Sequence, residues 1–202
     1  MSKVFFVAAV AVLLGAGAAQ ASDGKALYAA KGCSTCHGAD GRKAIAATPH
    51  LAGQNAAYLL RQMTEIADGT RSSPPVKPMK SFIEKVAVEE RKVIADWLAA
   101  QAPAESVAGD VPKAVKGEEL FDEHGCIGCH GANGAKPLAD YPVLAGQRKD
   151  YVMAQIKAIR DEVRSTRRAR LMVANVRTLK EAEVEQLAEY VSQSKRVGNP
   201  PR

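Results

Sequence analysis

The sequence predicts an all-α protein built from one unit that occurs twice. At an offset of 93 residues, 25 of the 78 residues in 24–101 match their counterparts in 117–194 without a gap. Apolar residues recur at helical spacing within each copy. A register shared over this length indicates an internal duplication, and a repeat of this size predicts two tandem domains rather than a solenoid.

Each copy is expected to contain three main helices. The first runs from about residue 23 to residue 31 and ends at Gly32, whose counterpart is Gly125; both glycines are typical of helix C-caps. The second covers residues 55–68, where apolar side chains follow helical spacing. The third covers residues 88–100 and 181–194, and Thr178 with Glu181 is expected to form a capping box before the later of these.

A glycine in each first helix predicts a close helix crossing. Gly24 precedes Tyr28 by four residues, and Gly117 precedes Phe121 by the same interval. The last helices offer Trp97 and Tyr190 as aromatic partners. We expect the glycines to let the first and last helices approach, and the aromatic pairs to fill each crossing.

The boundaries follow from composition. Residues 1–21 have a charged start, a short apolar core and an Ala-Gln-Ala site, which predict a cleaved signal peptide and a periplasmic protein. The stretch 103–112 is small, polar and rich in Pro and Gly, as linkers are. The predicted domains are therefore 22–102 and 113–202.

The chain is basic, with a formal net charge of +6. The basic residues are dispersed and aromatic residues are scarce, so the composition does not favour nucleic-acid binding. Only 5% of the residues are aromatic, too few to fill two cores without an additional apolar group.

The four cysteines lie in two Cys-x-x-Cys-His runs. Cys33, Cys36 and His37 form the first, and Cys126, Cys129 and His130 the second. This run is the attachment signature of covalent haem c, in which two thiols bind the porphyrin and the histidine binds the iron. The sequence therefore predicts two covalently bound haem c groups.

Three other kinds of site also contain paired cysteines. Zinc ribbons place their two pairs about 15–20 residues apart, whereas Cys36 and Cys126 are 90 positions apart. A thioredoxin-type pair requires a βαβ context that the sequence does not suggest. Structural disulfides suit an exported protein but do not explain a histidine after both pairs.

The duplication selects a second iron ligand in each copy. Met79 follows Cys33 by 46 residues, and Met172 follows Cys126 by the same interval. Met63 and Met153 align with other apolar residues and are expected to fill the core. His50 and His124 have no histidine counterpart and are expected to be exposed and unliganded. Paired His/Met ligation closes both iron faces, which favours one-electron transfer over substrate binding.

Several repeated segments together resemble the dihaem cytochrome c4 family. They are the doubled Cys-x-x-Cys-His-Gly, the Pro-x-Leu-Ala-Gly-Gln segment, a Tyr-x-x-x-Gln helix, an arginine and the late methionine. The resemblance covers essentially the whole mature chain. It implies two class I cytochrome c domains related by a pseudo-two-fold axis. It also implies that the carbonyls of Pro49 and Pro142 orient the ligand histidines, and that four residues lie near the propionates: Tyr58, Tyr151, Arg71 and Arg164.

The resemblance implies a carrier of single electrons from a quinol-oxidising complex to a terminal oxidase. One alternative is the haem subunit of a periplasmic dehydrogenase complex, such as flavocytochrome sulfide dehydrogenase. Another is a dihaem enzyme, such as a peroxidase or a thiosulfate dehydrogenase, which paired His/Met ligation disfavours. Four arginines precede Met172 and form either a docking surface for an acidic redox partner or a solvated loop. Peripheral association with a membrane stays open at this point.

Overall fold

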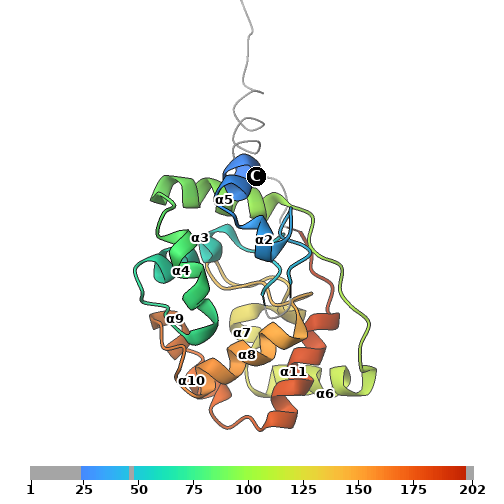
Figure 1. Cartoon of the computed structure of the whole chain (residues 1–202). Helices are drawn as coiled ribbons and strands as arrows, with labels where there is room; N and C mark the ends of the chain where they lie inside the picture. The colour runs from blue at the N-terminus through green and yellow to red at the C-terminus, as the bar shows by residue number, and fades with distance from the viewer. Residues whose placement is uncertain (1–23, 46–47, 199–202) are drawn as a thin grey trace, which may run out of the picture.

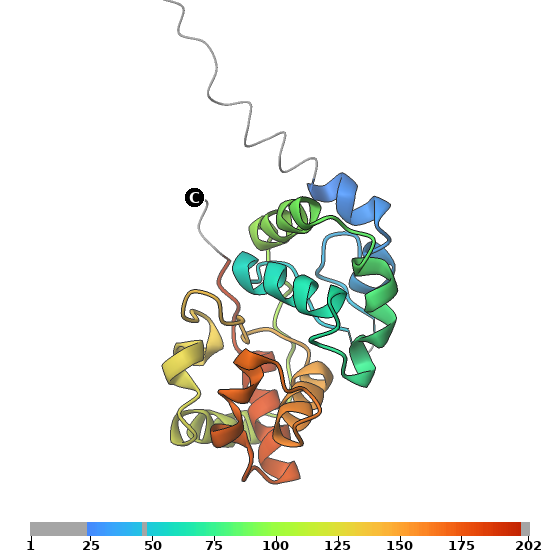
Figure 2. The ribbon, with the colours of Figure 1, turned by 90° about the vertical axis from the view of Figure 1, so that its left-hand side faces the viewer.

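The computed structural model describes residues 24–45 and 48–198. The predicted signal peptide, residues 1–21, lies outside this part of the chain. Within the described residues the structure is helical and contains no strand. The chain forms two lobes, an N-terminal one drawn from blue to green and a C-terminal one from yellow to red (Figures 1 and 2). The predicted all-α fold with two tandem units is confirmed.

Each lobe repeats one order of helices. The first contains the helix of residues 24–30 and then α2 (Ser34–His37), α3 (Ala56–Ala67), η1 (Pro74–Val76), α4 (Lys77–Ile83) and α5 (Val88–Ala100). The second contains α6 (Val111–Glu123), α7 (Ile127–His130), η2 (Ala132–Gly134), α8 (Lys149–Arg160), α9 (Arg167–Arg170), α10 (Val173–Val176) and α11 (Glu181–Gln193). Helix α6 begins within the last two residues of the predicted linker. Among the described residues, no helix is long and apolar enough to cross a membrane.

The first helix of each lobe ends at the predicted glycine. Gly32 and Gly125 have φ angles of 75° and 68°, in the left-handed region that favours glycine. The amide of the next cysteine then bonds back to an aromatic residue of the helix: Cys33 to Tyr28 at 3.1 Å, and Cys126 to Phe121 at 2.9 Å. The turn thus sets where each cysteine pair begins.

The predicted helix crossings are confirmed. A Cβ atom at Gly24 would lie 2.3 Å from the Trp97 Cβ, and one at Gly117 would lie 2.0 Å from the carbonyl oxygen of Gln186. The aromatic partners pack beside these contacts, with ring centroids 5.0 Å apart for Tyr28 and Trp97 and 5.5 Å apart for Phe121 and Tyr190. These contacts therefore hold the first and last helices of each lobe together next to the cysteine motif.

The predicted capping box at Thr178 is wrong. Thr178 lies in a turn, and α11 begins after Lys180, whose backbone N–H donates to the Glu183 carboxylate at 2.7 Å. The equivalent Glu90 accepts from the Ala87 N–H at 2.9 Å. Both last helices thus begin with a glutamate at the third helical position, because this residue satisfies an otherwise unpaired amide.

The segments that carry the late methionines are more helical than expected. Met79 lies within α4, and Met172 is the N-cap of α10. Pro74 and Pro78 each occupy a first-turn position of a helix, where a missing N–H costs nothing. These prolines therefore stand at the starts of two short helices.

Asn55 caps α3 and also contacts the other lobe. Its side-chain oxygen accepts from the amides of Ala57 and Tyr58, and its Nδ2 donates to the carbonyl of Ala139 at 2.6 Å. The equivalent Arg148 makes no side-chain cap. Helix α3 therefore has a side-chain N-cap that its counterpart α8 lacks.

We expect Asn55→Ala to lower the free energy of unfolding by about 1 kcal/mol, the usual cost of losing an N-cap. Denaturant unfolding of the purified protein measures this change. Arg148→Ala, at a helix start without a side-chain cap, is the matched control and should cost less. Equal losses in the two variants would contradict a capping role for Asn55.

The C-terminal segment passes between the lobes and places Arg196 there. Its guanidinium is 4% exposed and donates to the carbonyl of Ala52 at 2.9 Å and to that of Ala145 at 2.7 Å. These two alanines are equivalent in the repeat. Burial lowers the pKa of Arg196 to about 10. Position 103, the counterpart of Arg196, is proline, so this link has no twin.

Candidate functional site

Each cysteine motif forms a single turn of helix, α2 or α7, facing the interior of its lobe. The turn ends at Gly38 or Gly131, with φ angles of 78° and 72°. The histidine of each motif is buried, with His37 4% and His130 3% exposed. All four cysteines are partly buried, and none of them forms a disulfide. One thiol and the imidazole of each motif, Cys33 with His37 and Cys126 with His130, line the interior cavity, whereas Cys36 and Cys129 are not part of its lining.

The buried histidines are held by the predicted proline carbonyls. Nδ1 of His37 lies 3.1 Å from the carbonyl oxygen of Pro49, and Nδ1 of His130 lies 3.2 Å from that of Pro142. Burial lowers the pKa of both imidazoles. A neutral ring that donates from Nδ1 keeps the Nε2 lone pair free for a metal. The Nε2 atom of His130 is in fact buried without a hydrogen-bond partner.

A cavity joins the two histidines to the two late methionines. Its walls include His37 and Met79 from the first lobe and His130 and Met172 from the second, with Cys33 and Cys126 at the same surface. The lining is mostly apolar and takes equivalent residues from the two lobes, so it suits one apolar group in each lobe.

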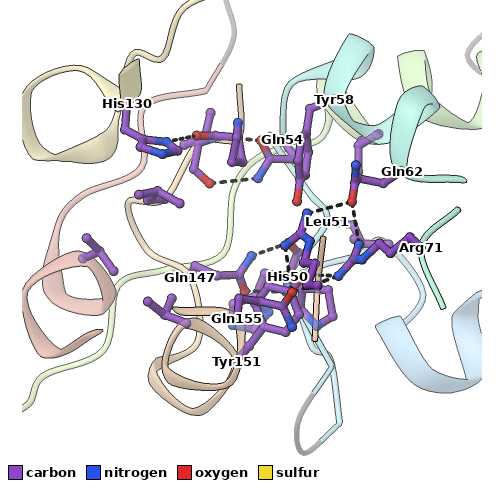
Figure 3. A pocket seen from close by; sticks show the side chains of 18 of the residues that line it. His50, Leu51, Gln54, Tyr58, Gln62, Arg71, His130, Gln147, Tyr151 and Gln155 are labelled. Carbon is purple, nitrogen blue, oxygen red and sulfur yellow. Dashed lines mark hydrogen bonds between the residues drawn. The ribbon is translucent and has the colours of Figure 1, made fainter. Parts of the chain in front are cut away.

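Two arginines and two glutamines form a buried network where the lobes meet. Arg71 donates to Gln62 at 2.7 Å and to Gln155 of the other lobe at 3.0 Å. Its counterpart Arg164 donates to Gln155 at 2.8 Å and to Gln62 at 2.9 Å. Figure 3 shows Arg71 with Gln62, Gln155 and Tyr151 around it. Because equivalent residues exchange equivalent bonds, the lobes are related by a pseudo-two-fold axis.

This network carries positive charge without a salt bridge of its own. Neither Arg71 nor Arg164 lies within 4.0 Å of a carboxylate among the described residues, and both Nε atoms are buried and unpartnered. Burial alone would raise the pKa of the Tyr58 hydroxyl, yet the charges of Arg164 and Arg71 lower it. A buried pair of cations with free donors fits a group that brings carboxylates, as haem propionates do.

Two histidines were predicted to be exposed, and that prediction is wrong. His50 and His124 are both partly buried. His50 lines the cavity, and its backbone pairs with Gln147 of the other lobe in the way that its counterpart Val143 pairs with Gln54. Position 50 therefore contributes through its backbone hydrogen bonds and not through its side chain, which is why valine occupies the equivalent position. Met63 is buried in the core as expected, and Met153 packs against the core of the second lobe.

The four arginines before Met172 do not form one surface patch. Arg164 is buried in the network between the lobes. Arg168 pairs with Asp140 at 2.8 Å and lies over the ring of Tyr141. Arg167 and Arg170 are exposed. The docking hypothesis is therefore restricted to these last two residues.

The role of the repeated glutamines was not predicted from the sequence. Gln54 and Gln147 end the Pro-x-Leu-Ala-Gly-Gln segments, Gln62 and Gln155 belong to the Tyr-x-x-x-Gln helices, and all four are buried between the lobes. The sequence did contain one indication of their burial: each glutamine recurs at the equivalent position of both copies, beside apolar residues. A repeat in the sequence does not distinguish a residue that contacts the other copy from a residue that packs inside its own copy.

The comparisons agree with this geometry. The cytochrome c family model matches residues 21–101 and 114–195. Cytochrome c4 of Azotobacter vinelandii is 33% identical, covering 74% of this chain and 76% of its own. The chain belongs to the dihaem cytochrome c4 family. The crystal structure of reduced cytochrome c4 from Pseudomonas stutzeri superposes with a TM-score of 0.75 at 29% identity, covering 87% of this chain and 98% of that one.

Relatives named for thiosulfate oxidation also match this cytochrome c4. The thiosulfate dehydrogenase electron acceptor of Stutzerimonas stutzeri is 34% identical over 91% of this chain and 92% of its own. A thiosulfate dehydrogenase from Marichromatium purpuratum superposes with a TM-score of 0.73 at 30% identity, and the match covers 87% of this chain and 40% of that one. As a member of the family, the protein carries two covalently bound haem c groups. It is an electron carrier that serves redox-partner proteins and not an enzyme.

Proposed function

We propose that each lobe holds one haem through its own cysteine pair and two axial ligands. The first haem is attached at Cys33 and Cys36 and ligated by His37 and Met79. The second is attached at Cys126 and Cys129 and ligated by His130 and Met172. The observation that carries this proposal is the shared cavity, in which a buried neutral imidazole and a thioether line the walls of each lobe.

The haem supplies one-electron chemistry, and the chain sets the reduction potential of the haem and its position relative to the second haem. A thioether ligand favours ferrous iron and raises the potential, and the apolar cavity wall acts in the same direction. Because a histidine and a methionine would occupy both axial positions, an electron could be exchanged with little rearrangement of ligands. Arg71 and Arg164 would bind propionates at the contact between the lobes, which brings both haems to one interface.

The family and the expected signal peptide support a periplasmic carrier, and we propose the route from a quinol-oxidising complex to a terminal oxidase. A second candidate is the acceptor of electrons from a thiosulfate-oxidising dehydrogenase. The relatives from Stutzerimonas stutzeri and Thiomonas intermedia, 34% and 31% identical, favour it because both are named thiosulfate dehydrogenase electron acceptors.

A spectroelectrochemical titration of the purified holoprotein tests the ligation. We expect two one-electron steps and a ferric iron–thioether absorption band. One haem per chain, or binding of cyanide by one haem as fast as by an open iron, would contradict the proposal. Stopped-flow mixing with a quinol-oxidising complex, or with a thiosulfate dehydrogenase and its substrate, separates the two routes: the physiological donor reduces both haems quickly.

Replacing Arg167 and Arg170 with serine tests the docking surface. If these exposed cations guide an acidic partner, the bimolecular rate of electron transfer should fall about tenfold at low salt, with a weaker dependence on ionic strength. The matched control is Lys25→Ser with Lys85→Ser, which removes the same charge from exposed positions of the other lobe. Equal effects in both double variants would mean that net charge alone matters.

A further inference from the structure

Two glutamine side chains cross between the lobes and bind the same backbone position on the other side. Gln54 accepts from the N–H of Val143 at 2.7 Å and donates to its carbonyl at 2.8 Å. Gln147 accepts from the N–H of His50 at 2.8 Å and donates to its carbonyl at 2.9 Å. Both amides are almost fully buried, 3% and 5% exposed, and Figure 3 shows each pointing across the contact. The arrangement is reciprocal, since both the glutamines and their targets are equivalent in the repeat.

Each glutamine bonds to the residue that directly follows the proline whose carbonyl orients the histidine: Val143 follows Pro142, and His50 follows Pro49. The carbonyl of Pro142 and the N–H of Val143 belong to one peptide group, which is planar and rigid. One end of that group bonds to Nδ1 of His130, and the other end bonds to Gln54. The same chain of bonds runs from His37 through the Pro49 carbonyl and the His50 N–H to Gln147. Each axial imidazole is thus one peptide group away from a side chain of the opposite lobe.

Hydrogen bonds in such a chain polarise one another. When the glutamine oxygen accepts from the N–H, electron density moves toward the proline oxygen, which becomes a better acceptor for Nδ1–H. The imidazole then gains anionic character and basicity, as carboxylate or carbonyl partners give to metal-bound histidines. A more basic ligand stabilises ferric iron and so lowers the reduction potential.

We propose that Gln54 and Gln147 are positioning residues that tune the iron ligand of the opposite lobe: Gln54 acts on His130, and Gln147 acts on His37. The inference rests on the proposed His/Met ligation. Its consequence is that each haem potential depends on the lobes being in contact.

Other bonds between the lobes do not have this property. Arg148 donates to the carbonyl of Ala44 at 2.9 Å, and Arg61 donates to that of Asp140 at 2.7 Å. Neither contact involves the peptide group that follows Pro49 or Pro142. They hold the lobes together without reaching an imidazole, which makes Arg148→Gln a suitable control.

The test uses the holoprotein with Gln54→Met, which keeps the side-chain volume. It removes the two hydrogen bonds to Val143, together with the one that the Gln54 oxygen accepts from the Asn55 N–H. In the reduced, diamagnetic protein, NMR follows the exchange of each Nδ1 proton with solvent. We expect the His130 proton to exchange faster, though by less than the roughly tenfold that losing its own hydrogen bond would give, because the bond to Pro142 is weakened and not broken. The His37 proton should keep its rate. The potential of the second haem, followed through its own resonances during a redox titration, should shift upward more than that of the first.

Gln147→Met should give the mirror-image result, and Arg148→Gln should leave both proton exchange rates unchanged. Equal changes at both histidines, changes in the glutamine's own lobe, or no change would overturn the inference. If Gln54→Met does not fold, Gln54→Asn shortens the side chain and is expected to give the same pattern. The ferric iron–thioether band is recorded for every variant: its absence from the unmodified protein refutes the ligation, whereas its presence without a crossed effect refutes only the role of the glutamines.

Discussion

Met79→Ala is expected to lower the potential of one haem by on the order of 0.2 V, a fraction of the ~0.8 V that axial ligands span. The thioether of Met79 lines the same cavity as His37. Alanine would leave that iron face to water or an external ligand, which favours ferric iron. The variant should also lose half of the iron–thioether absorption and bind cyanide at one haem.

Met172→Ala should do the same to the other haem, and Met63→Leu is the control. Met63 is buried in the core of the first lobe, and leucine preserves its apolar volume. Cyanide binding and a titration of each variant supply the measurements. If Met63→Leu lowers the potential and Met79→Ala leaves it unchanged, then the repeat has been misread and Met63 is the ligand.

Gly117→Ala is expected to give the largest loss of stability. The new Cβ would lie 2.0 Å from the backbone carbonyl oxygen of Gln186, and a backbone atom cannot move aside as a side chain can. Overpacking costs about 1–3 kcal/mol and more where the backbone must shift, so we expect a loss of at least ~3 kcal/mol. Denaturant unfolding of the second lobe, followed by its haem absorption, measures it.

Gly128→Ala is the matched control in the same lobe. A Cβ atom at this position meets nothing within 4 Å, and the equivalent residue of the first lobe is Thr35. Within α7, alanine is the better helix former. We therefore expect no loss of stability. A loss at Gly128 as large as that at Gly117 would show that any added methyl disturbs the haem motif and that the helix crossing is not the cause.

Much of the fold could be predicted because the duplication doubles every local signal. The helix around residues 56–67 and the glycine crossings follow from spacing and turn chemistry, which act within a few residues. The short helices that carry Met79 and Met172 were missed because each spans one or two turns. Such segments are held by packing against the rest of the lobe rather than by helix propensity.

The contact between the lobes was not predictable in the same way. Arg164 was read as part of a surface patch because three more arginines follow it, yet it is buried against Gln62 of the other lobe. His50 was read as exposed because its side chain is not repeated. Both errors have one cause: a sequence shows which residues recur, but not which face of one copy covers the other.

The position of Arg196 has a consequence for how the two lobes share their stability. Its buried guanidinium donates to equivalent carbonyls of both lobes, those of Ala52 and Ala145. If either lobe opens, part of this buried donor loses its partner, which costs about 1–3 kcal/mol. Arg196 therefore couples the unfolding of one lobe to that of the other.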